Sequence, residues 1–332
     1  MPVATSTPKT LPAGIYCPTL TFFQPTAEQD LDLETHARHM EFLAKSGIQG
    51  VVLQGSTGEA VALDRDERKQ MIRVAKETFS RIGNSGTIIA GTVGAQSTRE
   101  NIILCKDAAE VGADFALILP PSYFPAMMTP DAIQSFYEDV ADASPIPVII
   151  YSYPGVCSGI NMDTDLILRL AVHPNIAGIK HTDHDVGKIA RESAALKGLQ
   201  TSFTVLGGAT DYLLGGLSVG GKGAITGMAN VAPRACAKAF ELFQAGKTTE
   251  ALEIAGEVSK AEWGMGKGGI MGTKYAVQKC NNYPESAALG RKPLPLVSAA
   301  TKSHVDAAFE SITAFERQLE KQGWVGKSLV AN

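Results

Sequence analysis

The stretch Ile48-Gln-Gly-Val-Val-Leu53 decides the fold class, because it is a nearly continuous apolar run of the length of a strand. Such runs are typical of strands that are covered on both faces, as in a parallel sheet. An amphipathic helical pattern follows from Asp64 to about Ser80. A strand followed by a helix is the repeating unit of α/β proteins, so this segment predicts one β/α unit.

The same alternation runs through most of the chain. Upstream, the pattern predicts a strand over Gly14–Leu20 and a helix over Asp30–Lys45. Downstream, each predicted strand is again followed by a helical pattern, and these strands are Thr87–Gly91, Phe115–Leu119, Val148–Tyr151, Ile176–Lys180, Phe203–Leu206 and Gly223–Thr226. Eight β/α units in about 245 residues match the size of a closed (β/α)₈ TIM barrel, whereas six units would suit a doubly wound sheet.

We expect three parts along the chain. The start, Met1–Thr10, is short, polar and proline-containing, so residues 1–12 are predicted to be a disordered N-terminal arm. Residues 13–247 form the predicted barrel. Residues 248–332 are predicted to be a helical extension packed on the barrel, with helices over Thr248–Glu262, Gly272–Lys279 and Ser303–Gln322.

Composition restricts the class of protein. The net charge of −4 and the pI near 5.9 give no support to a nucleic-acid or anionic-membrane partner. No apolar run approaches the roughly 18 residues of a membrane span, and the first residues lack the apolar core of a secretory signal. The five cysteines are scattered without C-x-x-C spacing, which is typical of reduced thiols. Together these features predict a cytoplasmic protein.

Several reactive side chains fall at the ends of predicted strands. Lys180 ends the sixth strand, Tyr151 ends the fifth, and Tyr123 follows the fourth. The loop Gly55-Ser-Thr-Gly58 follows the second strand. Active sites of barrels lie at the carboxyl ends of their strands, so these groups are expected to meet on one face.

Lys180 is the central candidate in this group. A lysine that ends an apolar strand is partly desolvated, which lowers its pKa toward the neutral amine. A neutral amine can attack a ketone to form a Schiff base. The structural alternative is a salt bridge at the strand end, for example with Asp183. Tyr151 is either a proton shuttle or an aromatic residue of the barrel interior.

The loop after the second strand is a candidate anion site. Its N–H groups and the hydroxyls of Ser56 and Thr57 can bind a carboxylate or a phosphate. The alternative is an ordinary, capped turn between a strand and a helix. Glu59 is expected to bond to backbone amides of the turn.

Three segments resemble the motifs of the dihydrodipicolinate synthase / N-acetylneuraminate lyase family. The first is Gly50-Val-Val-Leu-Gln-Gly-Ser-Thr-Gly-Glu-Ala60, followed by Glu67. The second combines Tyr151-Ser-Tyr-Pro154 with Gly178-Ile-Lys-His-Thr182, and the third is Gly220–Pro233. The resemblance runs from about residue 13 to 320, and three motifs in the right order are far more specific than any one of them.

The resemblance implies a class I aldolase or lyase that handles pyruvate, closest in character to fungal 2-keto-3-deoxy sugar acid aldolases. Lys180 matches the lysine that forms an imine with pyruvate, and Tyr151 matches the tyrosine that moves protons. Thr57, with the adjacent amides that include Gly55, matches the site of the pyruvate carboxylate. Ser56 matches a hydroxyl of the proton relay.

The resemblance also implies contacts beyond the pyruvate site. Tyr123 matches a relay tyrosine that family members insert into a neighbouring subunit's site, and Ile225 matches a backbone-carbonyl position near the substrate. Members are usually homotetramers, arranged as a dimer of dimers. They need neither a metal nor an organic cofactor, since the covalent imine supplies the chemistry.

The sequence departs from the synthases after the catalytic tyrosine. Synthases carry an Arg there that binds the carboxylate of the aldehyde partner, but residues 151–159 contain no Arg or Lys. We therefore expect cleavage of a 2-keto-3-deoxy sugar acid, such as 2-keto-3-deoxy-L-galactonate, to pyruvate and a neutral hydroxyaldehyde such as glyceraldehyde. The hydroxyls of Ser152, Tyr153 and Ser158 are candidates for contacting the sugar. Alternatives are a 4-hydroxy-2-oxoglutarate aldolase, a hydratase-aldolase for aromatic pyruvates and, less favoured, dihydrodipicolinate synthase.

Single features of the sequence leave other functional classes open. His181-Thr-Asp-His-Asp185 is dense in metal-ligand types, although Asp183 is also typical of a helix N-cap. Cys157 is a candidate nucleophile without a nearby base. Gly264-Met-Gly-Lys-Gly-Gly269 is interpreted as a helix break rather than a phosphate loop. A barrel kept only as a binder or scaffold would have lost the catalytic set that is present here.

Overall fold

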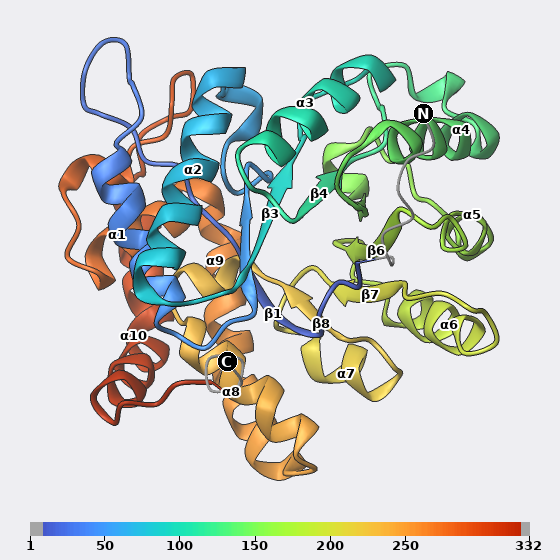
Figure 1. Ribbon diagram of the computed structural model, residues 1–332. Helices are drawn as coiled ribbons and strands as arrows, with labels where there is room; N and C mark the ends of the chain where they lie inside the picture. Colours follow the sequence, from blue (N-terminus) through green and yellow to red (C-terminus); the bar gives the residue numbers. More distant parts are fainter. Residues whose placement is uncertain (1–8, 327–332) are drawn as a thin grey trace.

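The computed structural model describes residues 9–326 and shows eight parallel strands closed into a barrel (Figure 1). Each strand pairs with its neighbours in sequence, and β1 pairs with β8. The strands are β1 (Gly14–Pro18), β2 (Gly50–Leu53), β3 (Thr87–Gly91), β4 (Phe115–Ile118), β5 (Val148–Ser152), β6 (Ile176–His181), β7 (Thr204–Gly207) and β8 (Gly223–Ile225). The predicted TIM barrel is confirmed.

A helix follows each strand and covers the outside of the barrel (Figure 1). These helices are α1 (Leu33–Ala44), α2 (Arg65–Ile82), α3 (Thr98–Glu110), α4 (Pro130–Ala143), α5 (Thr164–Leu170), α6 (Val186–Leu196), α7 (Leu213–Ser218) and α8 (Pro233–Gln244). Short 3₁₀ helices lie at η1 (Ala60–Ala62), η2 (Pro125–Met127), η3 (Pro154–Val156), η4 (Gly227–Asn230) and η5 (Glu285–Ala288). Four of these 3₁₀ helices, η1 to η4, lie in the segments between a strand and the helix that follows it, at the carboxyl ends of the strands.

Local sequence explains where the helices begin. Asp64 caps α2 in a capping box, in which Glu67 returns a hydrogen bond to the Asp64 N–H. Ser97 and Thr129 accept hydrogen bonds from backbone N–H groups in the first turns of α3 and α4. Helix α6 is capped by Asp185, so the expected cap at Asp183 is wrong. Asp183 is left available for ion pairs.

The barrel interior is filled by apolar side chains from alternate strand positions. Tyr16, Val52, Ile149, Leu206 and Ile225 belong to one buried cluster there. Leu11 belongs to the same cluster and is 1% exposed. Residues 1–8 lie outside the described residues. The prediction of a disordered arm over residues 1–12 is wrong for Leu11, which is buried against the barrel.

The C-terminal extension consists of two long helices, α9 (Thr248–Cys280) and α10 (Ala299–Lys321). The expected break between Thr248–Glu262 and Gly272–Lys279 is confirmed at Gly269, where two helical segments meet at a kink (φ 59°, ψ −161°), but it is confined to that residue. A Cβ on Gly264 would lie 2.3 Å from the Cβ of Ala308 on α10. The glycines therefore allow α9 and α10 to pack closely, and this packing outweighs the low helix propensity of glycine.

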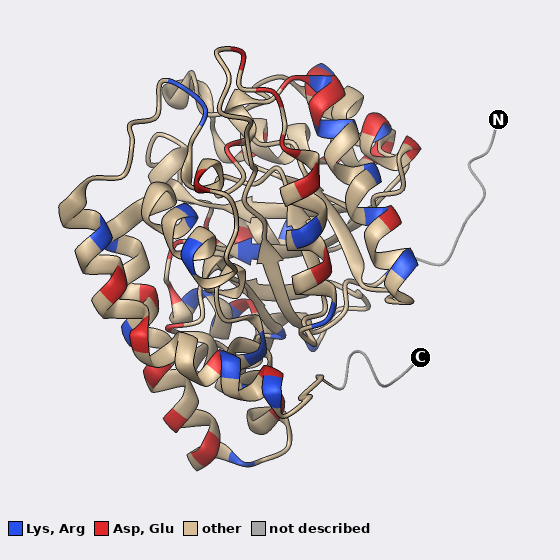
Figure 2. Cartoon of the chain, turned by 90° about the vertical axis from the view of Figure 1, so that its left-hand side faces the viewer, with Lys and Arg blue, Asp and Glu red and all other residues tan. Residues whose placement is uncertain are grey.

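Charged residues lie on the outer surface, and the cysteines are mostly buried. In the view of Figure 2, acidic and basic residues are interspersed over the outer helices. None of the helices in residues 9–326 combines the length and the apolar character that crossing a membrane requires. All five cysteines are free thiols, and four of them are buried.

Candidate active site

Lys180 and Tyr151 lie side by side at the carboxyl ends of β6 and β5. The two residues are paired in the strand register, and the Lys180 Nζ lies 4.1 Å from the centroid of the Tyr151 ring. Lys180 is 4% exposed, and burial lowers its pKa to about 7. Within residues 9–326 Lys180 forms no ion pair, so the structural alternative of a bridge to Asp183 is wrong. A substantial fraction of the amine is therefore neutral near pH 7.

The phenol of Tyr151 is buried and protonated at neutral pH. Burial raises its pKa to about 12, and the nearby hydroxyls of Ser56 and Thr182 partly oppose this rise. The Ser56 Oγ and the Thr182 Oγ1 are themselves buried, and both lie beside the Tyr151 phenol. Buried polar atoms are nearly always paired, so the two hydroxyls and the phenol form one polar group in an otherwise apolar interior.

Thr182 is a site residue that our sequence reasoning missed. It lies inside a motif that was quoted, but no role was assigned to it. A signal was available, because residues two apart on a strand point to the same face. Since Lys180 faces the site, the second residue after it is expected to lie on the same side.

The loop after β2 has the backbone shape of an anion site. Its internal hydrogen bonds run from the Gly58 N to the Gly55 O (3.1 Å) and from the Glu59 N to the Ser56 O (3.1 Å). In the described part of the chain, no hydrogen bond uses the N–H groups of Ser56 and Thr57. A Cβ on Gly55 would meet nothing within 4 Å, so the loop borders open space. Adjacent free N–H groups of this kind bind carboxylates.

Glu59 has different partners from those expected. Its carboxylate does not bond to amides of its own turn but accepts from the Lys274 Nζ (2.5 Å) and from the Arg291 N (2.8 Å). Both partners belong to the C-terminal part of the chain. Lys274 and Arg291 were not singled out from the sequence, because no local pattern links them to the loop.

The C-terminal extension also contacts the other side of the rim. Glu262 of α9 accepts hydrogen bonds from the Thr226 Oγ1 (2.8 Å) and from the backbone N–H groups of Thr210 and Asp211 (2.7 Å each). Burial raises the pKa of Glu262 to about 7. Thr226 follows Ile225, which lies fully buried in the interior cluster that contains Tyr151. Helix α9 therefore contacts the barrel rim at two places: beside the loop after β2, through Lys274, and beside Ile225, through Glu262.

Ser152 does not face Lys180. Because side chains alternate along a strand, Ser152 points away from the interior that Tyr151 faces, and its Oγ donates to the Asp183 Oδ2 (3.1 Å). The Ser158 Oγ donates to the Ser122 O (2.9 Å). The expected role of Ser152 in substrate binding is therefore corrected. Tyr153, another candidate hydroxyl, lies beside Tyr151, with ring centroids 5.8 Å apart.

Tyr123 is not brought to Lys180 of its own chain. Its side chain is 77% exposed and packs edge-on against Phe124, which is 64% exposed. The backbone is held in place, since the Tyr123 N donates to the Gln96 Oε1 (2.9 Å). With Met127, these residues form an exposed apolar cluster beside the barrel mouth.

The histidine-rich segment after β6 forms an ion-pair network. Burial alone would lower the pKa of His181, but its contacts with Asp183 and Glu192 outweigh burial and raise that pKa to about 9. Lys188 also pairs with Asp183, at 2.7 Å. His184 is exposed and lies against the Tyr212 ring instead, so the two histidines have different surroundings. The described residues contain no group of three or more His, Cys, Asp or Glu able to hold a metal ion.

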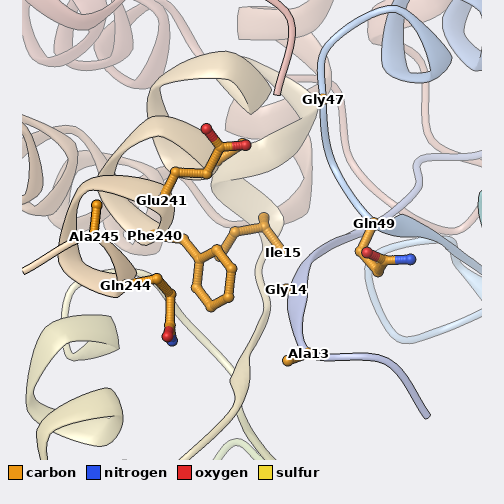
Figure 3. Close-up of a pocket in the computed structure, with 10 residues that line it drawn as sticks. Ala13, Gly14, Ile15, Gly47, Gln49, Phe240, Glu241, Gln244 and Ala245 are labelled. Atoms are coloured by element: carbon orange, nitrogen blue, oxygen red, sulfur yellow. The ribbon is translucent and has the colours of Figure 1, made fainter. Parts of the chain in front are cut away.

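Two further features, Cys157 and a surface pocket, are not the catalytic group. Burial raises the pKa of Cys157 to about 11, which leaves a protonated thiol rather than an activated nucleophile. A surface pocket, with a lining that includes Ala13, Gln49, Phe240 and Gln244, opens at the amino-terminal end of the strands (Figure 3). Lys180 ends its strand at the opposite end, so this pocket is not the catalytic site.

Comparisons with known proteins agree with this geometry. A sequence model of the dihydrodipicolinate synthetase family matches residues 11–312. A relative from Emericella nidulans, named "Probable 4-hydroxy-2-oxoglutarate aldolase, mitochondrial", is 42% identical over 310 residues, which cover 93% of this chain and 97% of the relative. The "L-threo-3-deoxy-hexylosonate aldolase" of Aspergillus niger is 38% identical, with 92% of this chain and 96% of the relative covered. The crystal structure of a dihydrodipicolinate synthase family protein from Coccidioides immitis has a TM-score of 0.85 and 38% identity, and it covers 95% of this chain and 100% of that chain.

Proposed function

The chain belongs to the dihydrodipicolinate synthetase family, and on this premise we propose that it is a class I aldolase that cleaves a 2-keto-3-deoxy sugar acid to pyruvate and a neutral hydroxyaldehyde. A substrate such as 2-keto-3-deoxy-L-galactonate would yield glyceraldehyde as the aldehyde. The observation that carries the proposal is Lys180, a buried amine that has no counter-ion in residues 9–326 and lies 4.1 Å from the centroid of the Tyr151 ring.

The chemistry follows from these two groups. The neutral Lys180 amine attacks the C2 carbonyl of the substrate, and loss of water gives a protonated imine. The phenolate form of Tyr151, which has passed its proton to the departing water, takes the proton of the C4 hydroxyl. The C3–C4 bond then breaks, its electron pair moves into the imine, and the aldehyde leaves. Protonation of the enamine at C3 and hydrolysis of the imine release pyruvate and return the amine.

The remaining site groups orient the substrate. We assign the carboxylate of the 2-oxo acid to the N–H groups of Ser56 and Thr57, next to Gly55, because these donors are unused and lie in a loop that borders open space. The Ser56 and Thr182 hydroxyls lie near the Tyr151 phenol and are assigned to proton transfer and to a substrate hydroxyl, respectively. No metal or organic cofactor is required, because the imine itself accepts the electron pair.

The charges near the rim support a neutral aldehyde product. Lys188 is engaged by Asp183 and by the Asn161 Oδ1 (2.6 Å), and Arg68 donates to the carbonyls of Ala60, Gly91 and Val93. A second carboxylate on the substrate would therefore lack a free cation from these residues. The main competitor is 4-hydroxy-2-oxoglutarate, which the relative from Emericella nidulans carries in its name.

We also propose a homotetramer, built as a dimer of dimers, in the cytoplasm. The exposed cluster of Tyr123, Phe124 and Met127 is large and apolar for a monomer surface, and burial between subunits would explain it. Sedimentation analysis tests the assembly. Microscopy of the full chain tests the compartment, because the name of the Emericella nidulans relative specifies mitochondria.

One experiment tests the chemistry and a second tests the substrate. Borohydride reduction in the presence of pyruvate, followed by peptide mass mapping, is expected to place a stable adduct on Lys180, and no adduct there would overturn the mechanism. Pyruvate release is then compared between 2-keto-3-deoxy-L-galactonate and 4-hydroxy-2-oxoglutarate. A clear preference for the sugar acid is expected, and equal turnover would remove the argument for a neutral aldehyde.

A further inference from the structure

The anion-binding loop Gln54–Glu59 is held in a shape that its own sequence does not favour. Gln54 and Glu59 have left-handed backbone conformations, with φ of 59° and 53°. Neither residue is glycine, and side chains of this size occupy that region only where the surroundings impose it. Backbone bonds within and next to the loop engage the N–H and C=O of Glu59, but its side chain is held only by groups outside the loop, and the Gln54 side chain donates to the Arg68 O.

The restraint at one end is a buried ion pair with helix α9. Lys274 is fully buried, and its Nζ lies 2.5 Å from the Glu59 Oε1. The other carboxylate oxygen of Glu59 accepts from the Arg291 N. The Arg291 guanidinium in turn makes a two-pronged contact with the Glu67 carboxylate on α2. Both oxygens of Glu59 are therefore held by the C-terminal part of the chain.

Thr21 closes a ring around the loop. Its carbonyl oxygen accepts from the Lys274 Nζ at 2.7 Å, and its hydroxyl donates to the Gly58 O at 2.6 Å. The ring thus runs from Lys274 to Glu59, along the backbone to Gly58, across to Thr21 and back to Lys274. It encloses the last peptide units of the loop that presents the free N–H groups of Ser56 and Thr57.

We propose that Lys274 is a positioning residue for substrate carboxylate recognition: through Glu59 and Thr21 it holds the N–H groups of Ser56 and Thr57 in the orientation that binds the carboxylate of a 2-oxo acid. The inference rests on the proposed function and deepens it. Lys274 does not touch the substrate. It holds the loop in its binding conformation before the substrate arrives, so that the loop loses no further conformational entropy when the carboxylate binds.

The proposal predicts a change in recognition that is separate from the chemistry at Lys180. Pyruvate and pyruvamide both carry the ketone that Lys180 attacks, but only pyruvate carries the carboxylate. Borohydride trapping at graded concentrations of each compound gives two half-saturating concentrations. Their ratio reports carboxylate recognition alone, and general loss of folded protein leaves it unchanged.

The main variant is the double substitution Lys274→Met with Glu59→Gln, which removes the ion pair without leaving a buried charge unpaired. We expect the half-saturating pyruvate concentration to rise about tenfold and the preference for pyruvate over pyruvamide to fall by about the same factor. The trapping rate at saturation is expected to change less than about threefold, because Lys180 and Tyr151 are untouched.

A matched control is available where the helical extension packs on the barrel. Arg234 of α8 and Glu316 of α10 form another buried ion pair, at 3.1 Å with both side chains 6% exposed. The double substitution Arg234→Met with Glu316→Gln removes a pair of the same kind away from the loop. We expect it to lower stability and to leave the preference for pyruvate over pyruvamide unchanged.

A milder variant covers the case in which the main variant does not fold. Thr21→Val removes the bond to the Gly58 O and a weak contact with the Met71 Sδ, and it buries no charge, so we expect a loss of preference of about threefold. An unchanged preference in either folded variant would overturn the inference while leaving the aldolase mechanism intact. Absence of any pyruvate adduct on Lys180 in the unaltered protein would instead overturn the proposed function, and this inference with it.

Discussion

Lys180 and Lys274 are both buried lysines at the carboxyl-terminal rim of the barrel, yet their surroundings differ. Lys180 is 4% exposed, and its Nζ lies over the Tyr151 ring with no carboxylate partner among the described residues. Lys274 is fully buried, and its Nζ lies 2.5 Å from the Glu59 carboxylate. Burial lowers the pKa of both amines, but only for Lys274 does a carboxylate oppose the shift.

The difference shows that burial alone does not make a lysine reactive. An amine becomes a nucleophile only when desolvation is left uncompensated, because a nearby carboxylate restores the charged form. Lys188 agrees with this rule, since it is 3% exposed but paired with Asp183. The position in the fold decides which lysine has a partner. Lys180 projects from a strand into an apolar interior, whereas Lys274 projects from a helix toward a polar loop.

The strongest test of the comparison is removal of each amine in turn, beginning with Lys180→Met. We expect the trapped adduct to disappear and kcat/KM to fall on the order of 10⁴-fold, because no other group can form the imine. Folding should not suffer, since a desolvated amine without a partner is replaced by an apolar side chain of similar length. Steady-state kinetics and thermal unfolding measure the two effects, and a variant that is both inactive and unstable would contradict a purely catalytic role.

Lys274→Met alone is expected to lower the stability of the protein, whereas Lys180→Met is expected to lower its activity. It leaves the Glu59 carboxylate buried without its cation, which costs about 4 kcal/mol of unfolding free energy. Adding Glu59→Gln to the same chain should restore most of that loss. Chemical denaturation of the single and double variants at one protein concentration measures the difference. If the single variant were as stable as the double, Lys274 and Glu59 would not be coupled.

The partner of Lys180 gives the next test. Tyr151→Phe keeps the ring beneath the ammonium and removes the phenol, so the imine should still form while proton transfer slows. We expect kcat to fall about 10²-fold, with the adduct on Lys180 still detectable. Complete loss of the adduct would show that Tyr151 holds Lys180 in place rather than moving protons.

The features that the sequence predicted are those set by local periodicity. The eight strands, Lys180 and Tyr151 follow from apolar runs and their ends, because strand length and alternation are local properties. The same alternation could have excluded Ser152, which must face away from the interior if Tyr151 faces it. It could also have included Thr182, two residues after Lys180.

The remaining features depend on contacts between distant parts of the chain. Lys274 lies 215 positions from Glu59, and nothing near either residue indicates the other. The glycines of α9 predicted a helix break, which lies at Gly269, but close packing against Ala308 of α10 keeps the residues before Gly269 helical, and the local sequence does not indicate that contact. Tyr123 is 77% exposed in the single chain, and the contact with a second subunit that we propose for it is not a property of local periodicity.

The smallest expected effect is the pH dependence of imine formation. It tests the comparison of Lys180 with Lys274 most directly, because it reports the pKa of Lys180. The pKa of Lys180 is about 7 instead of 10.5, so the neutral amine is the main form above pH 7. Below pH 7 the trapping rate should fall about tenfold for each pH unit, and above it the rate should level off. Trapping with pyruvate and cyanoborohydride between pH 5 and 9 measures this profile.

Tyr151→Phe is the control for that profile, because the pKa of Tyr151 is about 12 and lies outside the range measured. The inflection near pH 7 should therefore remain in this variant, at a lower rate. A rate that keeps rising about tenfold per unit from pH 7 to pH 9 would mean that Lys180 has the pKa of an ordinary lysine. In that case burial without a partner would not distinguish Lys180 from Lys274, and the reactivity of Lys180 would have to come from its position beside Tyr151 alone.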